Sequence, residues 1–194
     1  MVTKIKESHS DVRRFGTAGV GAGLLWIAVA ALTIAARISE NQSGAFDGTE
    51  EAIWGVMTVA IITAGLLTLT EMVGIRHELG LEKAGVVGIG LVGLGTAAGL
   101  VAWAFPLWGG LMGIGMLIFS LPMIRQGNAP RSAAVAFGFG MLGGIALFIL
   151  LDAIKLGPVD SYGDYPVAIE IGFVTMALVS AYGTILIGRW LTTR

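Results

Sequence analysis

The sequence predicts an all-α, polytopic membrane protein built from six transmembrane helices. Hydrophobic residues make up 55% of the 194-residue chain, and charged residues make up only 13%. A soluble globular domain usually has about 25% charged residues. In addition, ten of the twelve Lys and Arg residues fall on one side of six apolar segments, which is the distribution expected of a membrane protein with a fixed orientation.

One apolar stretch is too long for a single membrane helix. From Ala84 to Ile124 the chain contains no Asp, Glu, Lys, Arg or His. As one helix it would extend roughly 60 Å, about twice the hydrocarbon core of a bilayer. The stretch must therefore fold back on itself. Pro106 marks the turn, because proline suits the first turn of a helix and disfavours helix in the residue before it.

Each of the six predicted segments has about 19–24 residues, which is enough to cross a bilayer. They are Phe15–Ala36, Ala52–Ile75, Ala84–Phe105, Pro106–Ile124, Ser132–Ile154 and Pro166–Gly188. The first segment follows basic residues, but it is longer than the roughly 7–15-residue core of a signal peptide, so we interpret it as a membrane helix. We expect the six segments to form a single domain, residues 1–194.

The basic residues orient the predicted helices. The ten that share one side are Lys4, Lys6, Arg13, Arg14, Arg76, Lys83, Arg125, Arg131, Arg189 and Arg194. Only Arg37 and Lys155 lie on the other side, where Trp54, Trp103 and Trp108 fit an interfacial aromatic belt. We therefore predict cytoplasmic N- and C-termini. Short loops and the lack of cysteine favour a multi-pass protein of a prokaryotic plasma (inner) membrane.

The odd-numbered segments begin alike, which leaves open an arrangement of three consecutive helical hairpins. Gly19-Val20-Gly21, Gly88-Ile89-Gly90 and Gly138-Phe139-Gly140 each precede small and aliphatic residues. With 30 glycines in the chain, this recurrence is also close to chance. Three hairpins, a similar chain length and a proline at a hairpin tip resemble the layout of the HdeD-like acid-stress membrane proteins. The first and third hairpin loops are longer here, and the resemblance brings no motif residues.

Four pairs of glycines spaced four residues apart lie within the predicted helices. They are Gly19 and Gly23, Gly95 and Gly99, Gly109 and Gly113, and Gly140 and Gly144. Small residues at this spacing let helix backbones approach closely in a membrane, where the lipid is as apolar as leucine. Two interpretations stay open. The glycines pack helices within one bundle, or they form an interface with a second subunit.

Three carboxylates inside or at the edge of the segments form the candidate functional residues, because charges in membrane helices are costly and often functional. Glu170 lies near the outer end of the last segment, on a small, weakly polar face that predicts an inward orientation. It is either a cation or proton site at the outer mouth of a pathway, or a structural carboxylate paired with Lys155 or capped by backbone and water. Asp152 lies three residues before Lys155, so Asp152, Lys155 and Glu170 form a candidate outer cluster.

Glu71 lies at the cytoplasmic end of the second segment, on a stripe with Ala60, Ala64 and Thr68 that also predicts an inward orientation. One interpretation is an inner-rim carboxylate that reaches water. In the other, Glu71 and Glu170 face one cavity and guard its opposite ends.

No residue pattern specifies a catalytic chemistry. Neither His9 nor His77 lies within a segment, so haem ligands are lacking. The H-E-x-x-H, G-x-S-x-G and P-loop patterns do not occur. We therefore expect no enzyme, no cofactor and no metal site. The net charge of −1 gives no reason to expect a nucleic-acid partner.

Two functions remain. The favoured one is a small-solute or ion transporter or channel component, with Glu170 as its key residue and a polar cavity between the second, fifth and sixth segments. The alternative is a non-catalytic structural or stress-associated membrane subunit, held in a homo-oligomer or larger complex by its glycine faces. In both cases the lipid bilayer is the constant partner.

Overall fold

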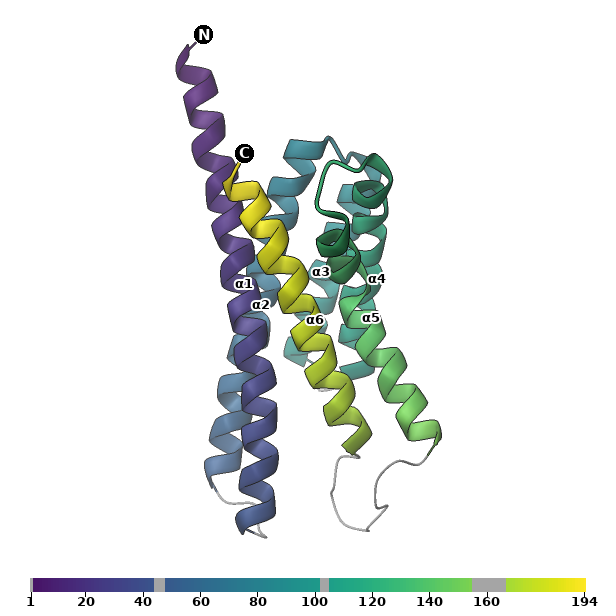
Figure 1. The fold of residues 1–194 in the computed structure, drawn as a ribbon. Helices are drawn as coiled ribbons and strands as arrows, with labels where there is room; N and C mark the ends of the chain where they lie inside the picture. Colours follow the sequence, from purple (N-terminus) through teal and green to yellow (C-terminus); the bar gives the residue numbers. More distant parts are fainter. Residues whose placement is uncertain (1, 44–47, 102–104, 155–166) are drawn as a thin grey trace.

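The computed structural model is a bundle of six α-helices (Figure 1). The helices are α1 (Val2–Ser43), α2 (Gly48–Leu79), α3 (Lys83–Val101), α4 (Phe105–Gln126), α5 (Arg131–Ala153) and α6 (Val167–Thr192). The structure describes residues 2–43, 48–101, 105–154 and 167–194. The all-α prediction is therefore confirmed.

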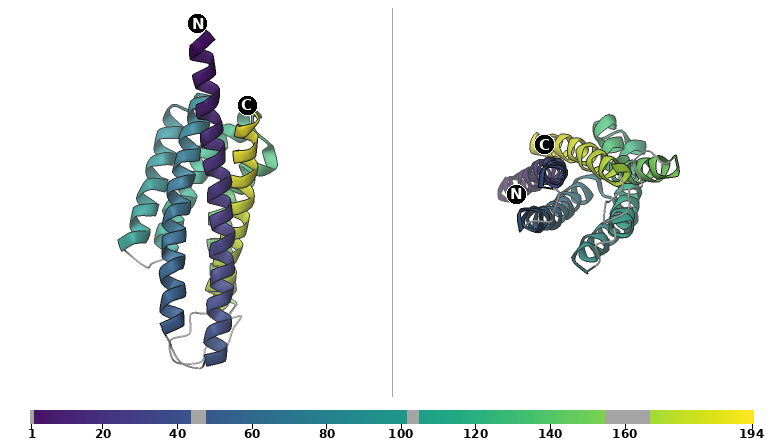
Figure 2. Two further views of the ribbon diagram at one scale, coloured as in Figure 1. Left: turned by 90° about the vertical axis from the view of Figure 1, so that its left-hand side faces the viewer. Right: turned by 90° about the horizontal axis from the view of Figure 1, so that it is seen from below.

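The helices are arranged in chain order around the bundle, and the order closes on itself (Figure 2). Helices α1 and α2, α3 and α4, and α5 and α6 pack against each other as three hairpins, and α6 also lies along α1. Contact between α2 and α3 is less extensive, so this seam is the loosest between helices adjacent in the sequence. Both chain ends lie at the same end of the bundle, as an even number of alternating passes requires (Figure 1).

Five helices of the described structure are long and apolar enough to cross a membrane. Their apolar parts are Val12–Ala36, Ala52–Leu79, Leu107–Gln126, Arg131–Ala153 and Ile169–Thr192. Helix α3 is also apolar, but its described apolar part, Lys83–Gly99, is shorter. The prediction of a helical membrane bundle is confirmed. Of the six predicted spans, five are long enough to cross a membrane in the described structure, and the apolar part of α3 is shorter.

Helix ends differ from the apolar segments where polar residues continue a helix. The predicted connection from Arg37 to Glu51 is mostly helical, because α1 continues to Ser43 and α2 begins at Gly48. Hydropathy identifies the part of a helix that suits lipid. It does not detect polar residues that continue the same helix beyond the membrane. The turn at Pro106 is confirmed, since α4 begins at Phe105 with proline in its first turn.

Two glycines end helices in the left-handed conformation. Gly80 after α2 has a φ of 63°, and Gly127 after α4 has a φ of 66°. The N–H of Gly127 donates to the carbonyl of Met123 at 3.1 Å, and the N–H of Leu81 donates to the carbonyl of Arg76 at 3.2 Å. Glycine adopts this conformation without the steric penalty of a Cβ atom, so both positions stop a helix sharply.

The interior contains methionine and aromatic side chains, and the outer surface is apolar. The seven described methionines are no more than 2% exposed: Met57, Met72, Met112, Met116, Met123, Met141 and Met176. Methionine is flexible and fills irregular gaps between helices. On the outside, Val59 and Leu94 are 65% and 62% exposed. Such large apolar side chains on the perimeter suit contact with lipid.

Glycine allows backbone contact at several seams of the bundle. A Cβ atom added at Gly16 on α1 would lie 2.5 Å from the carbonyl oxygen of Gly188 on α6. A Cβ atom at Gly144 on α5 would lie equally close to the carbonyl oxygen of Gly172 on α6. Since real Cβ atoms do not approach other atoms so closely, these seams require glycine at their present spacing.

The eight glycines of the predicted pairs do not behave alike. Gly19, Gly23, Gly95, Gly113, Gly140 and Gly144 lie against a neighbouring helix. A Cβ atom added at Gly99 would make only an ordinary contact, 3.9 Å from Cγ of Trp108, and Gly109 is buried. Since Gly16, Gly172 and Gly188 make equally close contacts outside the pairs, the four-residue spacing does not by itself mark the seams. The role of the four glycine pairs as packing motifs, within the bundle or between subunits, stays a prediction.

We expect Gly144→Ala to lower the free energy of unfolding by about 1–3 kcal/mol, because overpacking would push α5 and α6 apart. Gly143→Ala is the matched control, since a Cβ atom there would meet nothing within 4 Å. Alanine should stabilise α5 at that position by up to about 1 kcal/mol through its helix propensity. Thermal unfolding in detergent, followed by circular dichroism, measures both. Equal stability of the two variants would contradict the packing described above.

Candidate functional site

The carboxyl group of Glu71 is the most unusual polar group of the described structure. The residue is 0% exposed. Among the described residues, neither carboxyl oxygen has a hydrogen-bond partner, and each exposes less than 1 Å². Buried polar groups in proteins are nearly always hydrogen-bonded, so such a group requires an explanation.

Helix α2 positions Glu71 through the stripe that its sequence predicts. Ala64, Thr68 and Glu71 are all 0% exposed, which confirms the inward orientation. The Thr68 hydroxyl donates to the carbonyl of Ala64 at 2.8 Å, so its proton is already used within the helix. The interpretation of Glu71 as a rim carboxylate that reaches water is wrong. Its side chain is enclosed because it turns toward α1 rather than toward the end of the bundle.

On the α1 side, the carboxyl group lies directly against the backbone of Gly19. Any side chain at position 19 would collide with Oε1 of Glu71. One turn further along α1, a Cβ atom at Gly23 would lie 2.9 Å from Oγ1 of Thr184 on α6. Gly188 of α6 in turn approaches the backbone around Gly19, at 3.1 Å for an added Cβ atom. Glu71 therefore lies where α1, α2 and α6 meet, a place that we call the three-helix junction.

The same combination of glycine and a buried polar side chain recurs around the bundle. A glycine faces a buried hydroxyl residue across four other seams: Gly138 and Ser120, Gly140 and Ser180, Gly23 and Thr184, and Gly65 and Thr96. Threonine hydroxyls in helices commonly donate to a carbonyl one turn back, as Thr96 does to Val92 at 2.8 Å. Among the buried polar residues of the described structure, only Glu71 is ionisable. It therefore occupies a position that hydroxyl groups occupy elsewhere.

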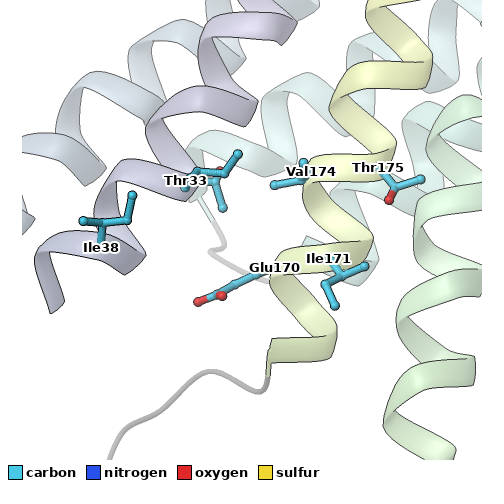
Figure 3. Close-up of a pocket in the computed structure, with 7 residues that line it drawn as sticks. Thr33, Ile38, Glu170, Ile171, Val174 and Thr175 are labelled. Atoms are coloured by element: carbon cyan, nitrogen blue, oxygen red, sulfur yellow. The ribbon is translucent and has the colours of Figure 1, made fainter. Parts of the chain in front are cut away.

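Glu170 lies in a different environment. It is half-buried on α6 and lines a groove of about 310 Å³ with Thr33, Ile34, Ile38, Ile171, Val174 and Thr175. Figure 3 shows its side chain extending toward α1, which carries Thr33 and Ile38. The groove at Glu170 thus lies between α1 and α6, not between the second, fifth and sixth helices, and its lining is mainly apolar.

The outer cluster of Asp152, Lys155 and Glu170 stays a prediction. Asp152 is exposed near the end of α5, and Glu170 extends away from α5 in Figure 3. Lys155 lies outside the described residues. Glu71 does not line the groove at Glu170, so a single cavity guarded by both carboxylates stays a prediction. No group of three or more His, Cys, Asp or Glu among the described residues could hold a metal ion.

The sequence favours Glu170 over Glu71 as the functional carboxylate when depth is measured from the ends of the apolar segments. Glu71 lies only five residues before Arg76, which suggested access to water. A glycine at the matching depth of α1 was the available signal. Gly19 belongs to one of the predicted glycine pairs, but spacing along one helix does not identify the residue that faces it across the seam.

Comparison with protein-family models, curated protein sequences and solved structures finds no match for this chain.

The contact between Gly19 and Glu71 should appear as an energetic coupling. We expect Gly19→Ala to destabilise the native protein by about 1–3 kcal/mol through overpacking, and to be tolerated when Glu71→Ala removes the carboxyl group. The coupling energy in this double-mutant cycle should be about 0.5–3 kcal/mol. Unfolding by a denaturing detergent, followed by circular dichroism, provides the measurement.

Gly21→Ala is the control for the double-mutant cycle, because a Cβ atom there would meet the side chain of Leu67 at 3.3 Å and not Glu71. Its effect should be the same with and without Glu71→Ala. If Gly19→Ala were equally independent of position 71, the two residues would not share the three-helix junction.

Proposed function

We propose that this protein is a small-solute or ion transporter, or a component of one, in which Glu71 is the key carboxyl group. One observation carries the proposal: an ionisable side chain is fully enclosed within a bundle of membrane helices, with no hydrogen-bond partner among the described residues. Ionisable residues inside membrane segments are rare, expensive to bury and concentrated on ion and proton pathways.

The environment of Glu71 favours it over Glu170 as the residue on which transport depends. Glu170 is half-buried in a groove at one end of α6, where water and lipid headgroups can compensate a charge. Glu71 is fully enclosed and lies against the backbone of Gly19, so its ionisation must be coupled to a change in its surroundings. We assign Glu170 the secondary role of an acidic group at the opposite mouth.

The proposed orientation follows from the basic residues. Arg125, Arg131, Arg189 and Arg194 are exposed. They are at the end of α4, the start of α5 and the end of α6, which lie toward the bundle end that carries both termini (Figure 1). By the positive-inside rule this end faces the cytoplasm of a plasma (inner) membrane. Glu71 then lies about 8 Å, measured along the helix axis, inside the level of Arg76 at the cytoplasmic end of α2.

The proposal predicts that Glu71→Gln abolishes an ion flux in proteoliposomes, because glutamine keeps the shape of glutamate and cannot release a proton. A pH-sensitive dye trapped in the vesicles measures proton flux under an imposed membrane potential. Sodium- and potassium-sensitive dyes test the other common cations in the same preparation. We expect Glu170→Gln to reduce the flux and Glu71→Gln to remove it.

Glu78→Gln is the control for the flux assay, because Glu78 is exposed on the same helix. It should transport as the unmodified protein does. A flux that survives Glu71→Gln would overturn the assignment of Glu71, and the absence of flux for every ion tested would count against transport of these ions.

The alternative function, a structural subunit held in an oligomer or complex, is supported by the outer face of α3. Gly90 and Gly93 would meet nothing within 4 Å if they carried a Cβ atom. Gly90 and Ala97 are exposed on the same helix. Open small residues on a lipid-facing helix are the surface that a second membrane helix can approach closely. Among the described residues, helix α3 is also the shortest of the six helices, with 19 residues.

If α3 is an interface, Gly90→Leu should convert an oligomer into a monomer in mild detergent, because a large side chain would keep the partner helix at a distance. Light scattering combined with gel filtration measures the mass. Gly55→Leu is the matched control, since this glycine of α2 is likewise exposed with nothing within 4 Å. A monomeric unmodified protein would rule out the homo-oligomer.

A further inference from the structure

We propose that Glu71 is a proton-binding site, in which the carboxyl group is held as the neutral acid inside the three-helix junction. It exchanges its proton toward the N-terminal end of α1 and the C-terminal end of α2. The site rests on geometry. Its use in coupling rests on the proposed transport function.

The small size of the enclosed space selects the proton over other cations. Both carboxyl oxygens are shielded, with less than 1 Å² exposed on each, and the group lies directly against the Gly19 backbone. A metal cation needs several further oxygen ligands around it, and no cluster of metal-ligating side chains exists among the described residues. A proton needs neither space nor a ligand set.

The neighbouring hydroxyl protons do not stabilise a charged carboxylate. The Thr184 hydroxyl, like that of Thr68, donates within its own helix, to the carbonyl of Ser180 at 2.9 Å. An ionised carboxylate that lacks a hydrogen bond is far more costly to bury than the neutral acid. The closed junction is therefore compatible with the neutral acid, and ionisation requires that water or a cation enters.

Phe15 occupies the route from Glu71 to the nearest end of the bundle. Its ring lies against Gly74 of α2, with Cγ 2.5 Å from the position that a Cβ atom of Gly74 would take. Gly74 follows Glu71 by three residues on α2, and Phe15 precedes Gly19 by four on α1, so the two contacts are stacked one turn apart. Phe15 thus lies one turn from Glu71 on the side that leads to the exposed helix ends, and we place the exit route past it.

The ionisable groups described around this exit are exposed, and most of them are basic residues. On the three helices that meet at the junction they are Arg13 and Arg14 of α1, Arg76 and His77 of α2, and Arg189 of α6. The acidic Glu78 of α2 is also exposed. A cationic rim of this kind stabilises the carboxylate form once the route past Phe15 is open. Proton release toward that side is then favoured by electrostatics.

Labelling with the lipophilic reagent dicyclohexylcarbodiimide tests the proposal directly. The reagent takes up the acid proton on one nitrogen while the carboxyl oxygen bonds to its central carbon. The acyl group then migrates to the other nitrogen, so the product retains every atom of both reactants as an N-acylurea. Only a protonated carboxyl group starts this reaction, and peptide mass spectrometry locates the added mass.

At about pH 8, where an exposed glutamate is ionised, we expect modification of Glu71 in the full-length protein in lipid vesicles. Glu78 and Glu82, both exposed, should stay unmodified. Glu71→Gln should eliminate the labelled peptide, and Glu78→Gln should leave it unchanged. Phe15→Ala should cause loss of labelling at this pH because water reaches the carboxyl group, whereas Phe15→Leu should retain it.

No modification of Glu71 at about pH 8, or labelling that disappears at the same pH as that of an exposed glutamate, would overturn the proton site. Equal labelling in the two Phe15 variants would overturn the proposed exit route. These outcomes are separate from the flux assay. Labelling of Glu71 without any flux would support the proton site and contradict its coupling to transport. Flux without labelling would contradict the proton site and leave the proposed transport function standing.

Discussion

Direct contact between helix backbones at glycine is the interaction on which the rest of this structure depends. Apolar side chains gain little by leaving lipid for the interior of a membrane protein, so the helices are held by close packing rather than by the hydrophobic effect. Gly16 with Gly188, and Gly144 with Gly172, bring α6 against its two neighbours at distances that no other residue allows. Because α6 packs along both α1 and α5, it joins the first and last hairpins.

Close contact also creates the positions in which polar groups can be enclosed. A glycine leaves a small depression in a helix surface, and across several seams a hydroxyl side chain from the next helix fills it. For Thr96, Ser120 and Thr184 this arrangement is inexpensive, because each hydroxyl donates its proton to a carbonyl of its own helix. For Glu71 it is expensive, because a carboxylate has no proton to donate and finds no donor among the described residues. At this position a carboxyl group stands where other seams have a hydroxyl group. The free-energy cost of burying it is the reason to assign Glu71 a function.

The two candidate carboxylates therefore differ in kind. Glu170 lies in a groove of about 310 Å³ that is open at the perimeter between α1 and α6. Glu71 lies within the bundle, next to the opposite part of the same pair of helices. Helix α1 lies against Glu71 at Gly19 and lines the groove at Glu170, so a movement of α1 along α6 would alter the surroundings of both carboxylates.

The sequence by itself determined the membrane class, the six helices, the three hairpins as one of its options and the inward face of Glu71. Hydropathy, prolines and helical periodicity are local properties, so Pro106 located a turn and Ala64, Thr68 and Glu71 identified a buried face. Only the tertiary structure decided that α1 lies beside α6, that Gly19 faces Glu71, and that the groove at Glu170 involves Thr33. Those contacts join residues far apart in the chain. The cost of a charge depends on what surrounds it in space, and for this reason the sequence placed Glu71 at a wet rim whereas the fold encloses it.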